Sequence, residues 1–368
     1  MRLDLSDPGT LSLVRMASLG LAPEHPDPAG DAPTRARALT ATVSAIGALQ
    51  SQDWPGAQHS LAMRVPGRSL EIARQAFNDG GLVRTWSLRG TLHTVAIADL
   101  PWMLAATASR TEHAAASRRA ALGITEATLE SALGVARQLL ARRSTTRRGL
   151  FSTWRDEGLV GQIPNQATHI LMTLCLRGHL ALGPIDADGS QQVIEISLPP
   201  TVGDPLVDYV QRYFSGHGPA TVEDLARWGG LTRTSLRPVL QRAARRAELA
   251  CTEVSSPQGV KVLWHRPDLD QIPGPALQAC RAMMLLSGFD ELILGYLDRS
   301  CTVTPDQQKL VCPGGNGVFK HTIVENGRVV GTWRRGRSGD PEPAFFTTPT
   351  ARRLRSFEAA AQPPTQPR

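Results

Sequence analysis

Residues 221–230 read TVEDLARWGG, and this stretch decides the fold. Thr221 followed three positions later by an acidic residue is typical of a capping box at the start of a helix, here with Asp224 in place of the usual Glu. The glycine pair at 229–230 predicts that this helix ends and leads directly into the next one, over residues 232–248. A short helix, a glycine turn and a second helix have helix-turn-helix spacing.

The sequence around this pair completes a larger pattern. A helix is predicted before it at 205–214, and two strands are predicted after it at 250–254 and 260–264. Three helices followed by a two-stranded hairpin is the winged-helix pattern. The same order recurs upstream, with helices at 126–140, 145–158 and 165–177 and strands at 178–184 and 193–198.

A further copy is predicted near the N-terminus. Residues 36–49 have helical apolar spacing, and Ser69 is a typical N-cap for a helix that runs to Asn78. Short strands at 82–83 and 91–95 predict a hairpin with its turn near Arg89-Gly90. Three copies in series favour tandem winged helices over chance helix pairs.

The residue pattern changes after residue 282, from helical spacing to apolar stretches interrupted by Gly and Asp. An apolar stretch at 283–293 precedes two predicted strands, 318–324 and 329–333. They are separated by Asn326-Gly327, the dipeptide that most strongly indicates a tight hairpin. This pattern predicts a small β-rich domain, and residues 359–368 are expected to be a disordered tail.

These patterns together predict an α+β chain with five segments. The expected segments are a first winged helix at 1–120, a second at 121–200, a third at 201–275, a C-terminal domain at 276–345 and a tail at 346–368.

The composition favours an acidic partner. The formal charge is +7 and the sequence pI is about 9.6, which suits nucleic acid. The lysines are limited to Lys261, Lys309 and Lys320, so nearly all the basic charge is arginine, whose fork matches phosphate and base edges. A GC-rich genome is the competing explanation for the arginine bias, so the excess charge is the stronger argument.

The location signals are consistent with the cytoplasm. Five widely spaced cysteines without a CxxC motif indicate neither a disulfide framework nor a zinc ribbon. Arg15 interrupts the apolar run at 11–21, so we expect no signal peptide. No apolar run of 18 residues is present, so we expect no membrane span.

The segment LQSQD at 49–53 carries the chemistry, together with RTWSLRGTLH at 84–93. Two amides, a carboxylate, two arginines and a histidine fit a metal site or a nucleophile triad poorly. They fit better a surface that positions water beside an already reactive, positively charged substrate. A small-molecule hydrolase is disfavoured, because the sequence has no GxSxG, HExxH or paired-carboxylate signature.

Several segments together resemble a known family. They are LQSQD, RTWSLRGTLH with Asp99 and Trp102 after it, EDLARWGGL at 223–231, FDELILGYLDRS at 289–300 and PGGNGVFKHTIVENGRVVGTWRR at 313–335. The chain resembles, over about residues 10–340, the winged-helix DNA glycosylases related to the actinobacterial azinomycin-resistance glycosylase. Many members of that family are described only as winged-helix DNA-binding proteins.

The resemblance implies three winged helices and a C-terminal β-barrel that form a C-shaped channel of DNA size. It implies a monofunctional DNA glycosylase for base excision repair or self-resistance to a genotoxic natural product. Such an enzyme hydrolyses the N-glycosidic bond of bulky N7- or N3-alkylated purines and leaves an abasic site. The alternative is a non-catalytic DNA-binding protein or transcriptional regulator.

The family motif is Gln, an aliphatic residue, then Gln or Asp. Gln50 and Gln52 match its two ends, whereas Ser51 departs from its aliphatic centre. We expect both amides to lie at the C-terminal end of the helix at 36–49. Without the resemblance, two solvated amides at a helix end would be the simpler reading.

Alkylation at N7 or N3 makes the purine cationic, so the base leaves as a neutral molecule. Catalysis then needs a placed water and stabilisation of an oxocarbenium-like sugar, as in glycoside hydrolysis. A glutamine carbonyl accepts a hydrogen bond from that water and directs its dipole at the developing cation. One such dipole is worth about 3–4 kcal/mol, which is enough for a weakened bond and too little for an undamaged nucleotide.

The other candidate residues each have a structural alternative. Asp53 is a rival general base or cation stabiliser, or a turn-forming residue. His93 is expected on a strand, as catalytic support or as a core histidine bonded to the backbone. The expected DNA-binding residues are Arg84, Arg89, Asn316, Phe319 and Lys320.

The DNA-binding candidates are expected in two settings. Arg84 and Arg89 flank a strand and either contact phosphate or are solvated. Asn316, Phe319 and Lys320 follow a Gly-rich turn in an expected protruding hairpin. Phe319 is either an apolar wedge in a groove or part of the core. The expected partner is double-stranded DNA, bound by a monomer in the nucleoid, without a metal, cofactor or membrane.

Overall fold

The computed structural model describes residues 3–22, 30–246, 248–256 and 259–362. Contacts divide the chain into two compact parts. Unit 1 comprises Met1–Ala73 and Val210–Arg368, and unit 2 comprises Arg74–Tyr209. This division is coarser than the five predicted segments, whose boundaries stay a prediction. Among the described residues, no helix is long and apolar enough to cross a membrane.

Unit 2 combines a β-sheet with helices. Its helices are α5 (Leu100–Ala121), α6 (Glu126–Leu140), α7 (Arg147–Asp156) and α8 (Gln166–Leu176), and its strands are β2 (Leu82–Leu88), β3 (Thr91–Ala96), β4 (Thr145–Thr146), β5 (Leu180–Ile185) and β6 (Gln191–Glu195). The chain passes from unit 1 to unit 2 within helix α4 (Leu70–Asn78), and it returns to unit 1 within α9 (Pro205–His217).

The two hairpins predicted in this part of the chain are confirmed, and they join in one antiparallel sheet. Within the unit, the strands pair in the order β3, β2, β5, β6, β4. The β2–β3 turn has positive φ at both Arg89 (50°) and Gly90 (71°), the geometry of a tight hairpin turn. Strand β2 also pairs with β5 at Arg84 and Leu182.

The helices predicted at 126–140, 145–158 and 165–177 are confirmed as α6, α7 and α8. The hydroxyl of Thr146 caps α7, and Gly158 follows this helix with a positive φ. The side chains of Leu150 and Trp154 are fully buried in a core that α6, α7 and α8 share with β2 and β5. Their spacing of four residues explains why α7 turns one face inward.

Unit 1 has a helical part and a sheet part. The helices are α1 (Pro8–Ser18), α2 (Ala32–Ile46), α3 (Trp54–Ala62), α10 (Val222–Gly229), α11 (Arg233–Arg245), α12 (Gly274–Ala279), α13 (Glu291–Leu294), α14 (Pro305–Val311) and α15 (Ala351–Ala361), and the strands are β1 (Leu49–Gln50), β7 (Ala250–Ser256), β8 (Gly259–His265), β9 (Met284–Leu286), β10 (His321–Glu325), β11 (Arg328–Arg335) and β12 (Pro341–Phe345).

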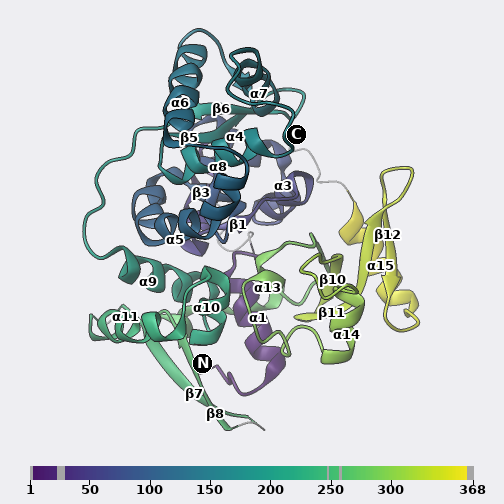
Figure 1. The fold of residues 1–368 in the computed structure, drawn as a ribbon. Helices are drawn as coiled ribbons and strands as arrows, with labels where there is room; N and C mark the ends of the chain where they lie inside the picture. Colours follow the sequence, from purple (N-terminus) through teal and green to yellow (C-terminus); the bar gives the residue numbers. More distant parts are fainter. Residues whose placement is uncertain (1–2, 23–29, 247, 257–258, 363–368) are drawn as a thin grey trace. The chain divides into compact units, whose positions relative to one another are not determined.

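The stretch at 221–230 forms the predicted helix start and turn. Asp224 Oδ2 accepts from Thr221 N and Oγ1, both at 2.9 Å, which completes the capping box. Gly230 ends α10 with a φ of 64°. Helix α11 and the β7–β8 hairpin follow in the predicted order, and Figure 1 shows this hairpin as a ribbon that extends away from α10 and α11.

The C-terminal sheet is open, so the predicted barrel is wrong. Its strands pair in the order β12, β11, β10, β9, and no closed barrel is found in the described residues. Pro341 and Pro343 in β12 lack the N–H that further pairing would require. The predicted β10–β11 hairpin is confirmed, with positive φ at Asn326 and Gly327.

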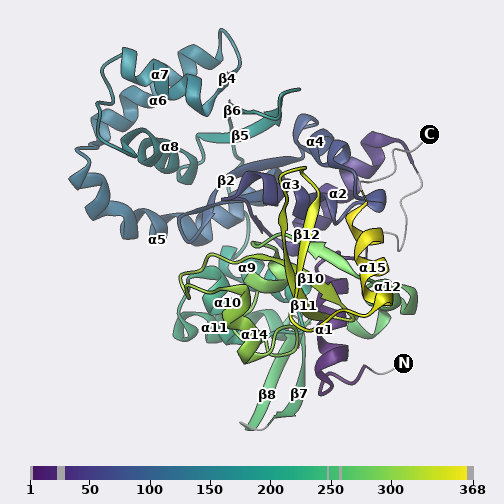
Figure 2. The same cartoon turned by 90° about the vertical axis from the view of Figure 1, so that its right-hand side faces the viewer.

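The expected disordered tail at 359–368 is wrong at its beginning, because residues 359–361 are helical. Residues 351–361 form α15, which lies against the C-terminal sheet (Figure 2). Phe357 and Ala360 are buried there with Leu285, Ile323 and Trp333. Phe357, Ala360 and Ala361 are three and four residues apart and form the helix face that packs on the sheet, whereas Ala359 is exposed. Residues 363–368 of the expected disordered segment lie outside the described residues.

Candidate active site

The two glutamines lie in an extended segment between two helices. Helix α2 ends at Ile46, earlier than predicted, because Gly47 takes a φ of 93° that terminates it. Gln50 therefore lies in β1, and Gln52 directly precedes α3. Their expected position at a helix C-terminus is wrong. Gln50 is half-buried and Gln52 is exposed, whereas Ser51 is fully buried and donates to Leu49 O at 2.9 Å.

A buried carboxylate holds this segment by its backbone. Gln50 N–H donates to Glu291 Oε1 at 3.2 Å. Glu291 Oε2 accepts from Trp228 Nε1 at 2.9 Å and lies 3.2 Å from His217 Nε2. Glu291 was not identified as a site residue from the sequence. Its signal was present, since an acidic residue inside the apolar run at 283–294 is rarely buried unless it has partners.

The preceding residue, Asp290, forms a second buried carboxylate site. It lies 2.8 Å from Arg64 Nη1 and accepts from Ser60 Oγ at 2.9 Å and Leu292 N at 3.0 Å. Burial alone would raise the pKa of Asp290, but Arg64 and these donors lower it below the usual value. The ion pair therefore fixes the start of α13, where Glu291 follows.

Asp53 stands at the N-terminus of α3, which supports the turn-forming alternative for this residue. It is the N-cap residue, although its side chain makes no capping hydrogen bond. Its carboxylate packs over Gly56, where a Cβ would collide with Oδ2 and would also approach Ser287 Cβ at 3.4 Å. The beginning of α3 therefore packs against the loop that leads to Asp290.

The same loop brings residues 319–321 towards this surface. A Cβ on Gly288 would collide with Phe319 O, so the two backbones are in close contact. Gly288 N–H also donates to His321 Nδ1 at 2.9 Å. The His321 ring stacks on Trp333 with centroids 4.6 Å apart. Burial lowers the pKa of His321 against an opposing influence of Asp53, which favours a neutral ring that accepts at Nδ1.

The predicted hairpin around Asn316 is absent, and an exposed loop takes its place. Strand β10 begins at His321, three residues later than predicted, and residues 313–318 are exposed. Asn316 Oδ1 accepts from Val318 N, a local turn that three glycines permit. Phe319 is half-buried with the Arg299 guanidinium 5.2 Å from its ring centre, and Lys320 is exposed.

The remaining predicted residues belong to unit 2. His93 is fully buried on β3, and its Nδ1 lies 2.9 Å from Thr91 O. This geometry favours the structural alternative for His93. Arg84 is 7% exposed and donates to Gln191 Oε1 at 3.0 Å, an arrangement that does not favour a phosphate contact. Arg89 is half-buried in the β2–β3 turn.

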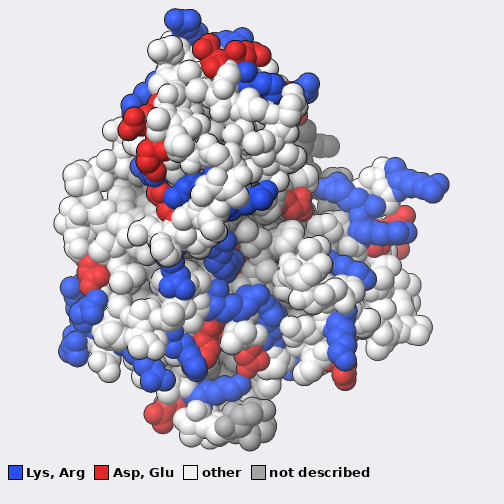
Figure 3. All heavy atoms as spheres, viewed as in Figure 1, with Lys and Arg blue, Asp and Glu red and all other residues white. Residues whose placement is uncertain are grey.

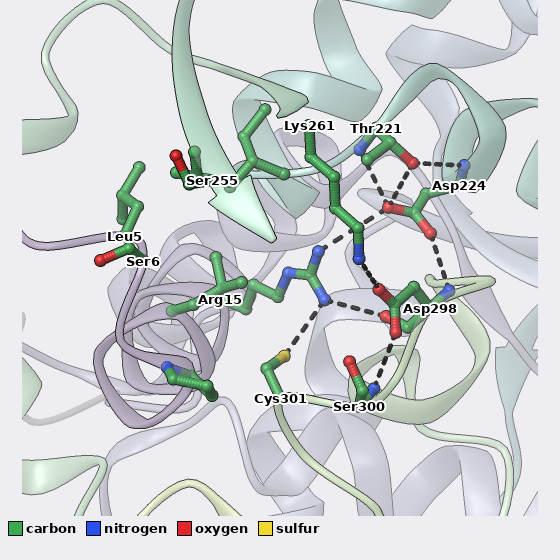
Figure 4. A pocket seen from close by; sticks show the side chains of 14 residues that line it. Leu5, Ser6, Arg15, Thr221, Asp224, Ser255, Lys261, Asp298, Ser300 and Cys301 are labelled. Carbon is green, nitrogen blue, oxygen red and sulfur yellow. Dashed lines mark hydrogen bonds and ion pairs between the residues drawn. The ribbon is translucent and has the colours of Figure 1, made fainter. Parts of the chain in front are cut away.

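Unit 1 also contains a pocket of about 280 Å³ whose lining includes the basic side chains of Arg15 and Lys261 (Figure 4). Arg15 donates to Pro219 O at 2.9 Å and to Asp298 O at 3.2 Å, and Lys261 lies 2.7 Å from Asp298 Oδ2. Its basic groups thus bond to other groups of the protein, and these contacts give no sign of a site for a cationic base.

Metal ligation has no support in the described ranges. Within residues 3–22, 30–246, 248–256 and 259–362, no three His, Cys, Asp or Glu side chains are grouped closely enough to hold a metal.

Exposed basic side chains are found on helix α11. Arg233, Arg237 and Arg245 are exposed on α11, which is the helix under the blue group at the lower left of Figure 3.

Comparison with known proteins identifies the family. The family model for AlkZ-like DNA glycosylases matches residues 43–363. An interstrand DNA cross-link repair glycosylase of Streptomyces sahachiroi is 24% identical over 298 residues, which are 77% of this chain and 79% of that protein. The solved structure of the Streptomyces sahachiroi DNA glycosylase AlkZ has the same α+β fold. Its TM-score is 0.68 at 21% identity, over 95% of this chain and 94% of that one. The chain belongs to the AlkZ-like DNA glycosylase family.

Proposed function

We propose that this protein is a monofunctional DNA glycosylase that hydrolyses the N-glycosidic bond of bulky N7- or N3-alkylated purines in duplex DNA. The product is an abasic site, and the context is base excision repair or self-resistance to a genotoxic compound. The observation that carries the proposal is the segment 50–52, in which two amides stay accessible while the central side chain is buried.

Gln50 and Gln52 are the proposed catalytic residues. Their carbonyl oxygens accept hydrogen bonds from the attacking water and stabilise the positive charge that develops on the deoxyribose. A cationic base needs no protonation to leave, so neither a strong acid nor a metal is required. The weakness of this chemistry gives selectivity, because an undamaged purine keeps too high a barrier.

The burial of Ser51 supports this role despite its departure from the family motif. The motif centre points into the protein, where Ser51 Oγ bonds to Leu49 O at 2.9 Å. A hydroxyl with this hydrogen bond can be buried as an aliphatic side chain is, and its burial fixes the extended segment on the protein. The two glutamines on either side then keep the orientation that the reaction needs.

We also propose the DNA-binding framework that the family implies. It consists of three winged helices around a C-shaped channel that holds the duplex. The protein acts on DNA as a monomer. The exposed arginines of α11 are suited to phosphate contacts. The loop after α14 is exposed and is suited to a DNA groove through Asn316, Phe319 and Lys320. Its end packs against Gly288, three residues before Glu291. For Asp53 and His93 we propose structural roles, at the N-terminus of α3 and in the buried strand β3.

The test is base release from duplex DNA that contains an N7-alkylguanine, followed by alkaline cleavage of the abasic site. We expect strand scission with the wild type in the presence of EDTA, and a loss of about 100-fold or more for Gln50→Ala or Gln52→Ala. Gln271→Ala, an exposed glutamine elsewhere in unit 1, is the matched control. Wild-type protein that releases no base from any of several adducts would contradict the proposal.

A DNA-binding protein without catalysis is the second candidate. The exposed arginines of α11, next to a helix-turn-helix turn at Gly230, favour it independently of the glutamines. It predicts sequence-specific binding that Gln52→Ala leaves unchanged, without base release. The base-release assay therefore separates the two candidates.

A further inference from the structure

We propose that Glu291 is a positioning residue for this reaction, one that acts through the backbone of Gln50. This inference rests on the proposed function. Glu291 does not face the substrate, because its side chain is fully buried. Its carboxylate fixes where the extended segment begins, and therefore where the amide of Gln50 points.

The contacts of the carboxylate come from two directions. Oε1 accepts the Gln50 N–H at 3.2 Å, whereas Oε2 faces Trp228 Nε1 at 2.9 Å and His217 Nε2 at 3.2 Å. A buried carboxylate is stable only when donors surround it. The bond to Gln50 is therefore part of what keeps this charge in the interior, and it is costly to break.

The groups behind the carboxylate are closely packed aromatic rings. The His217 ring stacks on Tyr213 with centroids 4.6 Å apart and lies 5.1 Å from the Trp228 ring. Tyr296 Oη donates to His217 O at 2.7 Å. A Cβ on Gly295 would collide with the His217 ring, so this position requires glycine. Glu291 thus connects Gln50 to a rigid aromatic cluster on α9 and α10.

Both oxygens of the Glu291 carboxylate face hydrogen-bond donors, Gln50 N–H at Oε1 and Trp228 Nε1 at Oε2. His217 Nδ1 is buried and has no hydrogen-bond partner within the described part of the chain. Its other ring nitrogen, Nε2, faces the carboxylate at 3.2 Å and is in position to donate a hydrogen bond to it. Trp228 Nε1 is always a donor. A glutamine at position 291 cannot accept on both sides, so its NH₂ group would face a donor.

The consequence for catalysis follows from geometry. A displacement of about 1 Å at a positioning contact costs on the order of 100-fold in rate. The side chain of Gln50 branches from the Cα that is bonded to the nitrogen that Glu291 holds, so loosening this nitrogen moves the carbonyl that accepts from water. DNA binding relies on other residues and is not expected to change.

The test compares Glu291→Gln with Glu325→Gln, a matched change at a carboxylate that is 8% exposed and bonds to Arg353 Nε at 2.9 Å. Single-turnover base release and DNA affinity are measured separately. We expect Glu291→Gln to slow base release about 10- to 100-fold with affinity within about twofold. Glu325→Gln should match the wild type in both.

A double-mutant cycle with Gln50→Ala separates positioning from a general structural effect. If Glu291 acts through Gln50, Glu291→Gln adds little in the Gln50→Ala background. An equal slowing in both backgrounds overturns the inference, as does an unchanged rate in the single variant. If Glu291→Gln does not fold, Trp228→Phe replaces it in the cycle, since this variant removes one donor to Glu291 and keeps an aromatic ring at the position.

The outcomes for the wild type keep the two proposals apart. A wild type that releases no base overturns the proposed function and this inference together. An active wild type whose rate is insensitive to Glu291→Gln overturns only the positioning role.

Discussion

Arg64 and Asp290 form an ion pair at 2.8 Å in which neither side chain is exposed to solvent. Arg64 also donates to Leu19 O and Ser60 O, each at 2.8 Å. The pair therefore connects α3 and the end of α1 to the residue before Glu291. The buried Arg64–Asp290 pair thus joins the N-terminal helices to the start of α13, next to the glutamine segment.

Removal of one partner of this pair should be strongly destabilising. Arg64→Ala leaves the Asp290 carboxylate buried without its counter-charge, and we expect a loss of about 3–5 kcal/mol in the free energy of unfolding. Urea denaturation measures it. Arg64→Met combined with Asp290→Leu should be less destabilising than Arg64→Ala alone, because no unpaired charge remains. A double variant that is the less stable of the two would contradict this account.

Stability should fall as the pH drops below neutrality. Burial lowers the pKa of His59 and of His321 below the ordinary value of 6.5. The unfolded chain then binds more protons than the folded one, so the stabilisation is complete above pH 6.5 and is lost as the pH falls through the lowered pKa values. Asp290 acts in a separate window, below its ordinary value of 3.8.

The measurement is the urea midpoint at about pH 7.5 and about pH 5.5. His321→Gln should flatten the difference, because an amide does not titrate and its oxygen can accept from Gly288 N–H. A midpoint that is the same at both pH values in the wild type would contradict this pH dependence.

The side chain of Ser51 should matter for stability and little for catalysis. Ser51→Ala removes the hydrogen bond to Leu49 O, which we expect to cost about 1 kcal/mol. Base release should stay within about twofold of the wild type, since the side chain points into the protein. A rate loss as large as that of Gln50→Ala would mean that Ser51 takes part in the reaction.

The arginines of α11 should contribute to DNA binding through charge alone. Arg233 and Arg237 are exposed, and Arg233→Gln with Arg237→Gln should weaken binding to alkylated and undamaged duplexes alike. The slope of log affinity against log salt should fall by about 0.9 for each phosphate that the variant no longer neutralises. An unchanged slope would mean that other basic residues bind the phosphates.

Local signals predicted most of the secondary structure. The capping box at Thr221 and Asp224, the Asn326-Gly327 turn and the helix over 126–140 all depend on residues that are near one another in the chain. Such signals act before any tertiary contact forms. One error missed a local signal, since Gly47 ends α2 with a positive φ. Another occurred at residues 351–361, where packing on the sheet stabilises α15.

The candidate site was predicted in part. Gln50, Gln52 and Asp53 were proposed from their spacing and from a family resemblance. The family is confirmed, whereas the roles of these residues stay a prediction. Glu291, His217 and Trp228 were not identified, because they lie far from Gln50 in the sequence and meet it only in the folded chain.

The amino-acid order by itself determined most of the helices and hairpins, since capping and turn formation are short-range interactions. Tertiary structure alone decided that the sheet stays open and that a buried carboxylate at position 291 holds Gln50. The physical reason is that strand closure and the burial of a charge depend on partners brought together by packing. One chain segment cannot specify those partners without the others.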